Sequence, residues 1–253
     1  MGLIMTIDTA IGLALPLMFF LMMALEPMIG TGLAMPHVRG WRWIGAAALL
    51  VTLACNALMP LFLLPLLPKF ELVGLAPFGL WAAIPVVVLT TFFTYWSHRI
   101  QHRFDGLWRL GHQLHHGVAR VDIASAMIFH PIDVAVQVTM TLLAGLLLGA
   151  TSEAAAVAGG LGFFIALYQH WNIATPRWVG FIIQRPEAHM LHHERDVHAR
   201  NFGDMPIWDM IFGTYANPLR ADVPVGFAPE AMRRWPAMIA CIDVNKGLGR
   251  DRL

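Results

Sequence analysis

The chain of 253 residues is 57% hydrophobic and only 13% charged, with a mean hydropathy of +0.60. Soluble domains carry about twice that charged fraction, so the composition indicates a membrane protein. A formal net charge of +1 without a basic stripe argues against a nucleic-acid partner. Cys55 and Cys241 form no CxxC motif, which argues against a disulfide scaffold or an iron–sulfur cluster.

Five apolar stretches of roughly the length of a membrane span follow one another along the chain. The first is expected to end near Glu26-Pro27, and Pro60 and Pro65 should bend or shorten the second. Only residues 151–153 separate the last two, which predicts a tight hairpin that either spans the bilayer or enters it from one side. The stretches cover about residues 9–25, 44–67, 72–96, 126–150 and 154–171.

The positive charges predict one orientation in the membrane. Of the 17 Lys and Arg residues, only Lys69 falls in a loop expected outside, and the rest belong on the cytoplasmic side. The predicted fold class is therefore an all-α polytopic membrane protein with four to five transmembrane helices and a cytoplasmic, histidine-rich helical cap. Within one structural domain we expect N-terminal spans at 1–97, a histidine-box region at 98–217 that includes the hairpin at about 126–171, and a cytoplasmic tail at 218–253.

Eight of the twelve histidines lie in three short boxes, with the patterns H-x3-H, H-x2-H-H and H-x2-H-H. On a helix, residues at i, i+3 and i+4 share a face, so each box presents imidazoles in one direction. Eight ligands are too many for one metal ion and about right for two, and neutral imidazole suits iron, zinc, copper or nickel. The plainer alternatives are interfacial or hydrogen-bonded histidines, or a structural zinc site, although such sites are usually rich in cysteine. The boxes contain His98 and His102, then His112, His115 and His116, then His189, His192 and His193.

Other polar residues flank the boxes or the ends of the predicted spans. His170 closes the fifth stretch, where we expect a metal ligand, whereas His130 opens the fourth and fits a ligand, a hydrogen-bond partner of a ligand, or a structural role equally well. His37 is expected to be interfacial. Further residues that suit a metal ligand or the support of one are Asn172, Glu194, Asp196 and His198.

The boxes resemble those of the fatty acid hydroxylase/sterol desaturase superfamily of integral-membrane di-iron enzymes. Residues 129–131, 169–172, 201–203 and 207–215 are similar to further signatures of that superfamily, and the resemblance covers about residues 90–217. It implies that the eight box histidines are catalytic and that two iron ions use O2 to attack a C–H bond of a fatty acyl, sterol-like or other membrane lipid. Zinc can replace iron in a purified form, because imidazole binds both metals.

The sequence contains no P-loop and no GxGxxG fingerprint, so the electrons are expected to come from a separate donor, such as a reductase, a ferredoxin or a cytochrome. The expected location is a bacterial inner membrane. A lipid desaturase or a carotenoid-type hydroxylase remains an alternative, as does a membrane b-type cytochrome. A transition-metal transporter is the alternative from another class, although it needs ligands distributed across the membrane depth. The sequence leaves the lipid, the choice between hydroxylation and desaturation, and the oligomeric state open.

Overall fold

The structure is a computed structural model that describes residues 6–29, 32–197 and 199–245. Within these ranges the regular structure is helical, apart from an isolated bridge between Glu194 and Val225. The predicted all-α fold class is therefore confirmed. The long helices are α1 (Ile7–Ile29), α2 (Trp41–Leu63), α3 (Ala83–Arg103), α6 (Pro131–Leu148) and α7 (Ser152–His170).

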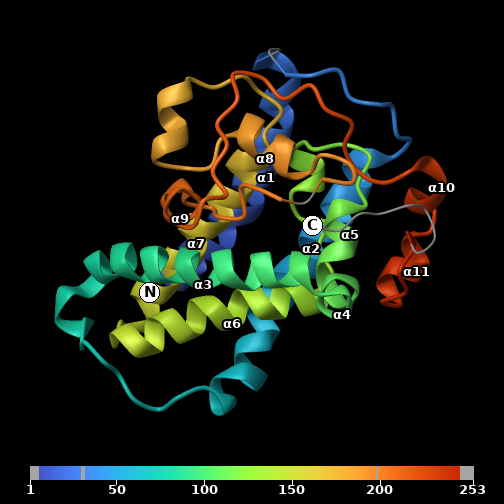
Figure 1. The fold of residues 1–253 in the computed structure, drawn as a ribbon. Coiled ribbons are helices and arrows are strands. Elements are labelled where there is room, and N and C mark those ends of the chain that lie inside the picture. Colours follow the sequence, from blue (N-terminus) through green and yellow to red (C-terminus); the bar gives the residue numbers. More distant parts are fainter. Residues whose placement is uncertain (1–5, 30–31, 198, 246–253) are drawn as a thin grey trace, which may run out of the picture.

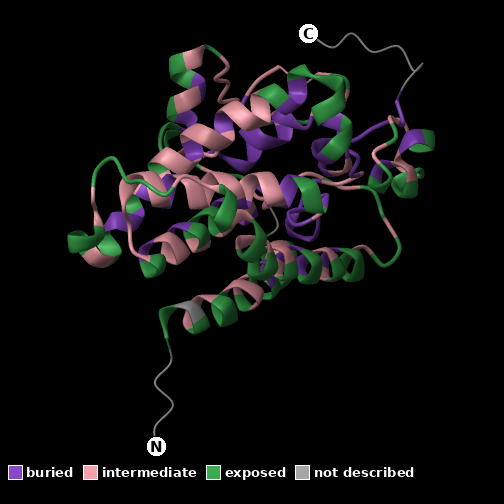
Figure 2. Ribbon diagram, turned by 90° about the horizontal axis from the view of Figure 1, so that it is seen from below, coloured by how far each residue is buried: buried purple, intermediate pink, exposed green. Residues whose placement is uncertain are grey.

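Four segments of the described chain are long and apolar enough to cross a membrane, which agrees with the predicted four to five spans. The helix α7 is not among them, because it carries more polar residues and glycines. Leu17 of α1 and Leu50 of α2 direct more than two thirds of their surface outward, where lipid can cover it. In Figure 2 the ribbon of α1, next to the N-terminus, is coloured exposed or intermediate along most of its length. The chain is an integral membrane protein with candidate spans at Thr9–Ile29, Trp41–Leu66, Ala76–Arg103 and Pro131–Leu148.

The long helices pack as neighbours in pairs (Figure 1). The helix α3 lies along α6 and also contacts α7, while α2 packs on α6 and α1 packs on α7. Buried alanines, among them Ala83, Ala144 and Ala158, lie where α3, α6 and α7 meet. Small residues let membrane helices approach closely, so this composition accounts for the tight packing.

The first helix continues past the predicted end at Glu26-Pro27 and stops at Ile29. Tertiary hydrogen bonds stabilise this end, because the Oε1 atom of Glu26 accepts the backbone N–H groups of Ile123 (3.1 Å) and Asn172 (3.0 Å). Proline also costs little in the last turn, since only one intrahelical hydrogen bond is lost there. The helix therefore ends two to three residues later than the sequence predicted.

The fourth predicted stretch begins at Pro131 rather than near Ala126. Residues before it form a separate short helix, η4 (Ile123–Ser125), in which the side chain of Asp122 accepts the N–H of Ser125 at 3.2 Å. Proline is favoured at the first position of a helix because its missing N–H would have no partner there. The chain therefore starts α6 at Pro131.

The predicted tight hairpin joins α6 and α7. Gly149 ends α6 with a φ of 61°, a left-handed conformation that favours glycine, and its N–H bonds to the carbonyl of Leu146 at 3.0 Å. Thr151 begins α7, and its side chain accepts the N–H of Ala154 at 3.2 Å. Only residues 149–151 separate the two helices.

Short elements form a cap at the ends of α3 and α7 (Figure 1). The C-terminal part of the chain belongs to this cap, because Gln113 donates to the carbonyl of Ile242 and accepts the N–H of Val244, both at 3.0 Å. The short elements η1 (Leu64–Leu66) and η2 (Ala76–Ala82) lie between α2 and α3. The cap contains α4 (Asp105–Leu107), η3 (Trp108–His112), α5 (Gln113–His116), η5 (Arg177–Phe181), α8 (Pro186–His192), α9 (Pro206–Phe212), α10 (Pro229–Met232) and α11 (Trp235–Ile239).

Candidate metal centre

Nine histidines converge at one end of the long helices. His98 and His102 lie one turn apart near the end of α3, and His170 is the last residue of α7. The second box lies on η3 and α5, and the third lies on α8 and the residue after it. Among the described residues, two groups bring ring nitrogens within 4.8 Å of one another: a first group of His98, His102, His112, His116 and His192, and a second group of His115, His170, His189 and His193.

The helical spacing explains how the boxes divide between the two groups. Residues at i and i+4 differ by about 40° around a helix, so both point to the same group. The pairs 98/102 and 112/116 belong to the first group, and the pair 189/193 belongs to the second. A residue at i+3 points about 100° away from its i+4 neighbour, and His115 and His192 accordingly reach the opposite group. Each H-x2-H-H box therefore connects both groups.

The surroundings of the first group fix which ring nitrogens carry protons. His98 Nδ1 lies 2.7 Å from the carbonyl oxygen of Phe202, and His192 Nδ1 lies 2.8 Å from that of Arg200. A carbonyl oxygen can only accept, so both Nδ1 atoms donate. In a neutral imidazole the Nε2 atom then carries the lone pair, which can accept a hydrogen bond or bind a metal. His112 follows the same rule, because its Nδ1 donates to the Oδ2 atom of Asp133 at 2.9 Å.

In the second group a serine hydroxyl fixes His170. The Ser125 hydroxyl donates to the backbone carbonyl of Asp122 at 2.7 Å, so it accepts from His170 Nδ1 at 3.2 Å. The Nε2 atom of His170 therefore offers a lone pair, and it lies 2.9 Å from the Nε2 atom of His189. His193 Nε2 lies 3.1 Å from that same His189 atom, so three ring nitrogens converge here.

The Nε2 atoms also converge in the first group. His102 Nε2 lies 3.1 Å from His98 Nε2, and His116 Nε2 lies 3.1 Å from the Nε2 atoms of both His112 and His192. Each contact is an N–H···N hydrogen bond when one of the two rings carries its proton on Nε2, and a cation that takes the place of that proton would be coordinated by both rings. At a metal–nitrogen distance of about 2.1 Å, adjacent ligands at 90° are about 3.0 Å apart and tetrahedral ligands about 3.4 Å apart. The observed 2.9–3.1 Å separations thus fit neighbouring positions around a metal with more than four ligands.

Burial keeps the cap histidines in the neutral form that metal coordination requires. Loss of hydration lowers the pKa of His115, His116, His189 and His193 well below the ordinary value of 6.5, and the neighbouring imidazoles lower it further. Neutral imidazole is the ligating species, so these rings do not have to release protons before they bind a cation.

Asp133 is a site residue that the sequence reasoning missed. Its carboxylate is buried, accepts from His112 Nδ1 at 2.9 Å and accepts from Gln101 Nε2 at 3.0 Å. It lies in the first turn of α6, where the positive end of the helix favours a negative charge. The acidic residue three places after His130 was the available signal, because carboxylates commonly orient metal-binding histidines.

A second carboxylate, Asp209 of α9, holds the loop whose carbonyl binds His98. Its oxygens accept the N–H groups of Phe202 and Gly203, both at 2.8 Å, and the hydroxyl of Thr214 at 2.7 Å. The ring of Phe202 lies 5.3 Å from that of His102, measured between centroids. The loop at residues 202–203 therefore contacts the first group through both its backbone and an aromatic ring.

His130 lies outside both histidine groups. Its Nδ1 accepts the N–H of Ile132 at 3.2 Å, and its Nε2 donates to the carbonyl of Ile239 at 3.1 Å. Both ring nitrogens are thus used, one to cap α6 and the other to bind the C-terminal segment. Of the roles that the sequence left open for His130, the structure shows the structural one.

The remaining sequence candidates also lie apart from the groups. Asn172 exchanges two hydrogen bonds of 2.8 Å with the backbone of Leu33. Glu194 pairs with Arg200 at 3.6 Å, and Asp196 occupies a turn with a φ of 63°. His198 lies outside the described residues.

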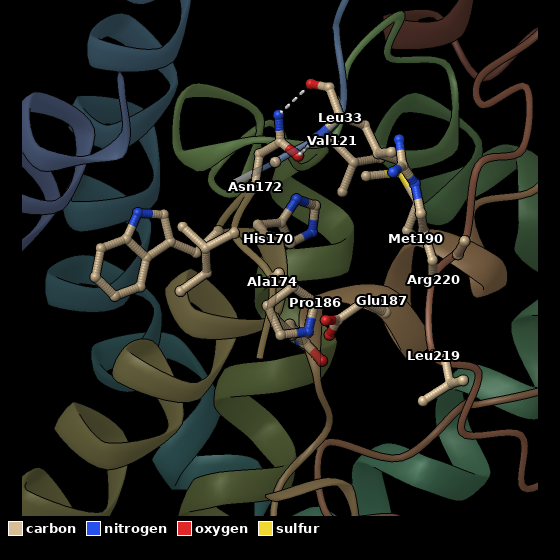
Figure 3. Close-up of a pocket in the computed structure, with 15 residues that line it drawn as sticks. Leu33, Val121, His170, Asn172, Ala174, Pro186, Glu187, Met190, Leu219 and Arg220 are labelled. Atoms are coloured by element: carbon tan, nitrogen blue, oxygen red, sulfur yellow. Dashed lines mark hydrogen bonds between the residues drawn. The ribbon is translucent and has the colours of Figure 1, made fainter. Parts of the chain in front are cut away.

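A cavity of about 120 Å³ borders the second group between the end of α7 and the start of α8 (Figure 3). His170 and Asn172 line it on one side, and Glu187 and Met190 line it on the other. Arg220 lies at its exposed edge, with its guanidinium 3.7 Å from Asp222. The cavity places a space of several water molecules beside one ring of the second group.

Comparisons with known proteins point to one family. A family model described as fatty acid hydroxylase matches residues 83–214, more than half of the chain, and this range contains all nine histidines of the two groups. Ornithine lipid hydroxylase OlsE of Rhizobium tropici is 30% identical over 166 residues, which are 64% of this chain and 50% of that protein. The chain thus spans about half the length of this relative. No solved structure matches significantly.

Proposed function

The chain belongs to the fatty acid hydroxylase family, and on that premise we propose that it is a membrane-bound di-iron oxygenase that hydroxylates a C–H bond of a membrane lipid. The reaction combines the lipid C–H bond, O2, two electrons and two protons, and it yields the C–OH product and one water molecule. The observation that carries the proposal is the convergence of nine imidazoles, eight of them buried, whose ring nitrogens lie close together in two groups.

Two iron ions fit these groups in number and in ligand type, since imidazole binds iron and the nitrogen separations match adjacent coordination positions. The first group would hold one ion with five histidines, and the second would hold the other with four. When bound, the iron pair supplies the activation of O2 that abstraction of hydrogen from an unactivated carbon requires. The chain itself orients the imidazoles, through Asp133, Ser125 and the Phe202 carbonyl, and buries the site away from bulk water.

A membrane lipid is the substrate class that suits a site at the end of apolar helices. The relative from Rhizobium tropici is named for the hydroxylation of ornithine lipid. We therefore propose amino-acid-containing membrane lipids as the first class to test, followed by phospholipids and isoprenoids.

We place the protein in a bacterial inner membrane with the histidine groups on the cytoplasmic side. The Lys and Arg residues are concentrated on the same side of the predicted spans as the boxes, which is the cytoplasmic side by the positive-inside rule. The electrons would come from a separate reductase, ferredoxin or cytochrome in that compartment. Attachment of an impermeant reagent to Cys241 in oriented membrane vesicles tests this orientation, and labelling from the periplasmic side would contradict it.

The direct test is an assay with purified protein. The full chain is reconstituted with iron and given a chemical reductant, extracted membrane lipid and O2 labelled with heavy oxygen. We expect about two iron ions per chain, as the two groups predict, and a lipid product that gains one labelled oxygen atom. A product that instead loses two hydrogen atoms would identify a desaturase, and the absence of any oxidised product in every lipid class would refute the proposal.

Histidine variants connect the activity with the site. His112→Ala and His192→Ala each remove a nitrogen of the first group and should abolish turnover and lower the iron content. His37→Ala is the matched control, because His37 is exposed and lies outside both groups. Activity that survives in both site variants would contradict the assignment.

A further inference from the structure

Six large apolar side chains lie exposed on η5, on the residue that follows it, and on α9. Their exposed fractions range from 38% to 64%. The two elements form one unit, because the N–H of Gln184 bonds to the carbonyl of Asp204 at 3.0 Å and the Tyr215 hydroxyl donates to the carbonyl of Gly180 at 2.8 Å. We call this surface the η5–α9 face; it consists of Trp178, Phe181, Ile182, Ile207, Met210 and Ile211.

The helix α9 of the η5–α9 face packs on α3 near the middle of its candidate span (Figure 1). Trp208 of α9 donates its indole N–H to the hydroxyl of Thr91 at 3.0 Å, and its ring lies 5.0 Å from that of Phe92. Thr91 precedes His98 by seven residues, which places it about 10 Å further along α3 from the metal centre. It is close to the midpoint of the candidate span Ala76–Arg103. The helix α9 therefore packs on a part of α3 that belongs at hydrocarbon depth.

The exposed surface of α3 beside α9 is apolar, like the η5–α9 face itself. Ile84 and Val88 of α3 are exposed apolar residues one turn apart, on a helix whose uncovered surface faces lipid. Asp209 is the acidic residue of α9, and it is buried and bonded to the Phe202–Gly203 backbone, so its charge does not reach the surface. Arg177 is exposed next to Trp178, the pair of residue types that favours a membrane–water interface.

We propose that the η5–α9 face is immersed in the leaflet on the side of the histidine groups, where acyl chains cover it. A contiguous exposed apolar surface needs a partner, and the bilayer that surrounds the adjoining span is the partner that continuity supports. Residues 177–182 and 206–212 then enter the membrane from one side without crossing it. Hydropathy alone misses these two segments, because each is a short helix followed or preceded by a polar loop. This inference goes beyond the proposed function and does not depend on it.

The immersion also has a consequence for the site. The lipid-facing residue Ile207 is five positions from Phe202, whose ring packs against the first histidine group. An acyl chain that contacts α9 therefore lies within a short distance of the metal centre along the protein surface.

Spin labels at single cysteines test the immersion directly. The two native cysteines are first removed from the full chain by Cys55→Ser and Cys241→Ser. A single new cysteine is then introduced by Phe181→Cys or Ile211→Cys, labelled, and the protein is placed in nanodiscs of phosphatidylglycerol and phosphatidylethanolamine. Collisions of the label with O2, which concentrates in hydrocarbon, are compared with collisions with a water-soluble nickel chelate. Leu50→Cys on α2 serves as the lipid-exposed control, and Asp222→Cys serves as the water-exposed control.

Immersion predicts an O2-to-nickel collision ratio at both test positions that matches Leu50→Cys and exceeds Asp222→Cys by about tenfold, because the chelate is excluded from the hydrocarbon core. A ratio like that of Asp222→Cys would overturn the proposal. Labels that collide with neither reagent would show that a second protein copy covers the face, which also overturns it. Should either variant fail to purify as a single species, Ile182→Cys and Met210→Cys probe the same face.

Discussion

Asp133 offers a way to perturb the first histidine group without removing a ligand. We predict that Asp133→Asn weakens metal binding there, although the side chain keeps its shape. The carboxylate now accepts from both His112 Nδ1 (2.9 Å) and Gln101 Nε2 (3.0 Å). Asparagine has one acceptor oxygen and an amide that can only donate, so it cannot satisfy both donors.

The magnitude follows from what the substitution does to His112. If the amide NH2 faces the ring, Nδ1 has to accept, the ring proton moves to Nε2, and the lone pair that points to the group is lost. Replacing a residue that orients a ligand typically lowers metal affinity by about 10- to 100-fold, which corresponds to about 1.4 to 2.7 kcal/mol. Because the carboxylate is buried, water has no access to restore the missing acceptor.

Metal analysis after graded dialysis measures this effect. Wild type and variants are dialysed against chelators of increasing strength, and the iron retained per chain is determined by mass spectrometry. Asp133→Asn should lose iron at a weaker chelator than wild type and approach the content of His112→Ala. Asp222→Asn, which changes an exposed aspartate in the same way, should behave as wild type.

The reasoning fails if Asp133→Asn keeps wild-type iron at every chelator strength. It also fails if the variant loses iron only together with its helical circular dichroism, because the residue would then support the fold rather than the ligand. A loss of iron from a folded protein is the outcome that only an orienting role predicts.

Three further predictions follow from the same geometry. Ser125→Ala leaves His170 Nδ1 without its acceptor, so iron retention by the second group should fall about tenfold, whereas the exposed Ser152→Ala should not change it. Gly203→Ala would place a methyl group 2.9 Å from the Asp209 carboxylate, so the loop at residues 202–203 has to shift. This shift should lower the thermal midpoint measured by differential scanning fluorimetry, and an unchanged midpoint would contradict the prediction. In metal-free protein, the buried cap histidines stay neutral while the unfolded chain takes up protons below about pH 6.5. The free energy of unfolding should therefore fall by up to about 1.4 kcal/mol per histidine and pH unit below that pH, and the thermal midpoint should fall as the pH decreases from 7.5 to 5.5; a midpoint independent of pH would refute this.

The helices and the boxes were predictable because both depend on local patterns. Runs of apolar residues identified the spans, and the spacing of four between His98 and His102 indicated one helical face. His170 could be placed near the boxes because it ends a predicted span on the same side of the membrane. These inferences need only helix geometry and the position of charges.

The partners of the imidazoles were not predictable, because they come from distant loops. The carbonyl that binds His98 is 104 residues away in Phe202, and the serine that binds His170 precedes it by 45 residues. The contact between Trp208 and Thr91 spans 117 residues and joins a cap helix to a membrane span. None of these pairs repeats with a helical period, so no pattern in the sequence indicates them. The division of each H-x2-H-H box between two groups also required the three-dimensional positions of the other boxes.

The structure assigns different tasks to helices and loops within the metal centre. The helices set the distances between imidazoles, since the turn between i and i+4 brings both rings to one group. The loops set the protonation of the rings, because Phe202, Arg200 and Ser125 supply the acceptors that keep the proton on Nδ1. A box transplanted onto another helix would reproduce the spacing without these acceptors, and its Nε2 atoms would be free to hold the proton. The histidine pattern is therefore necessary for the site but insufficient, and the loops at residues 122–125 and 200–203 carry the part of the chemistry that the pattern does not.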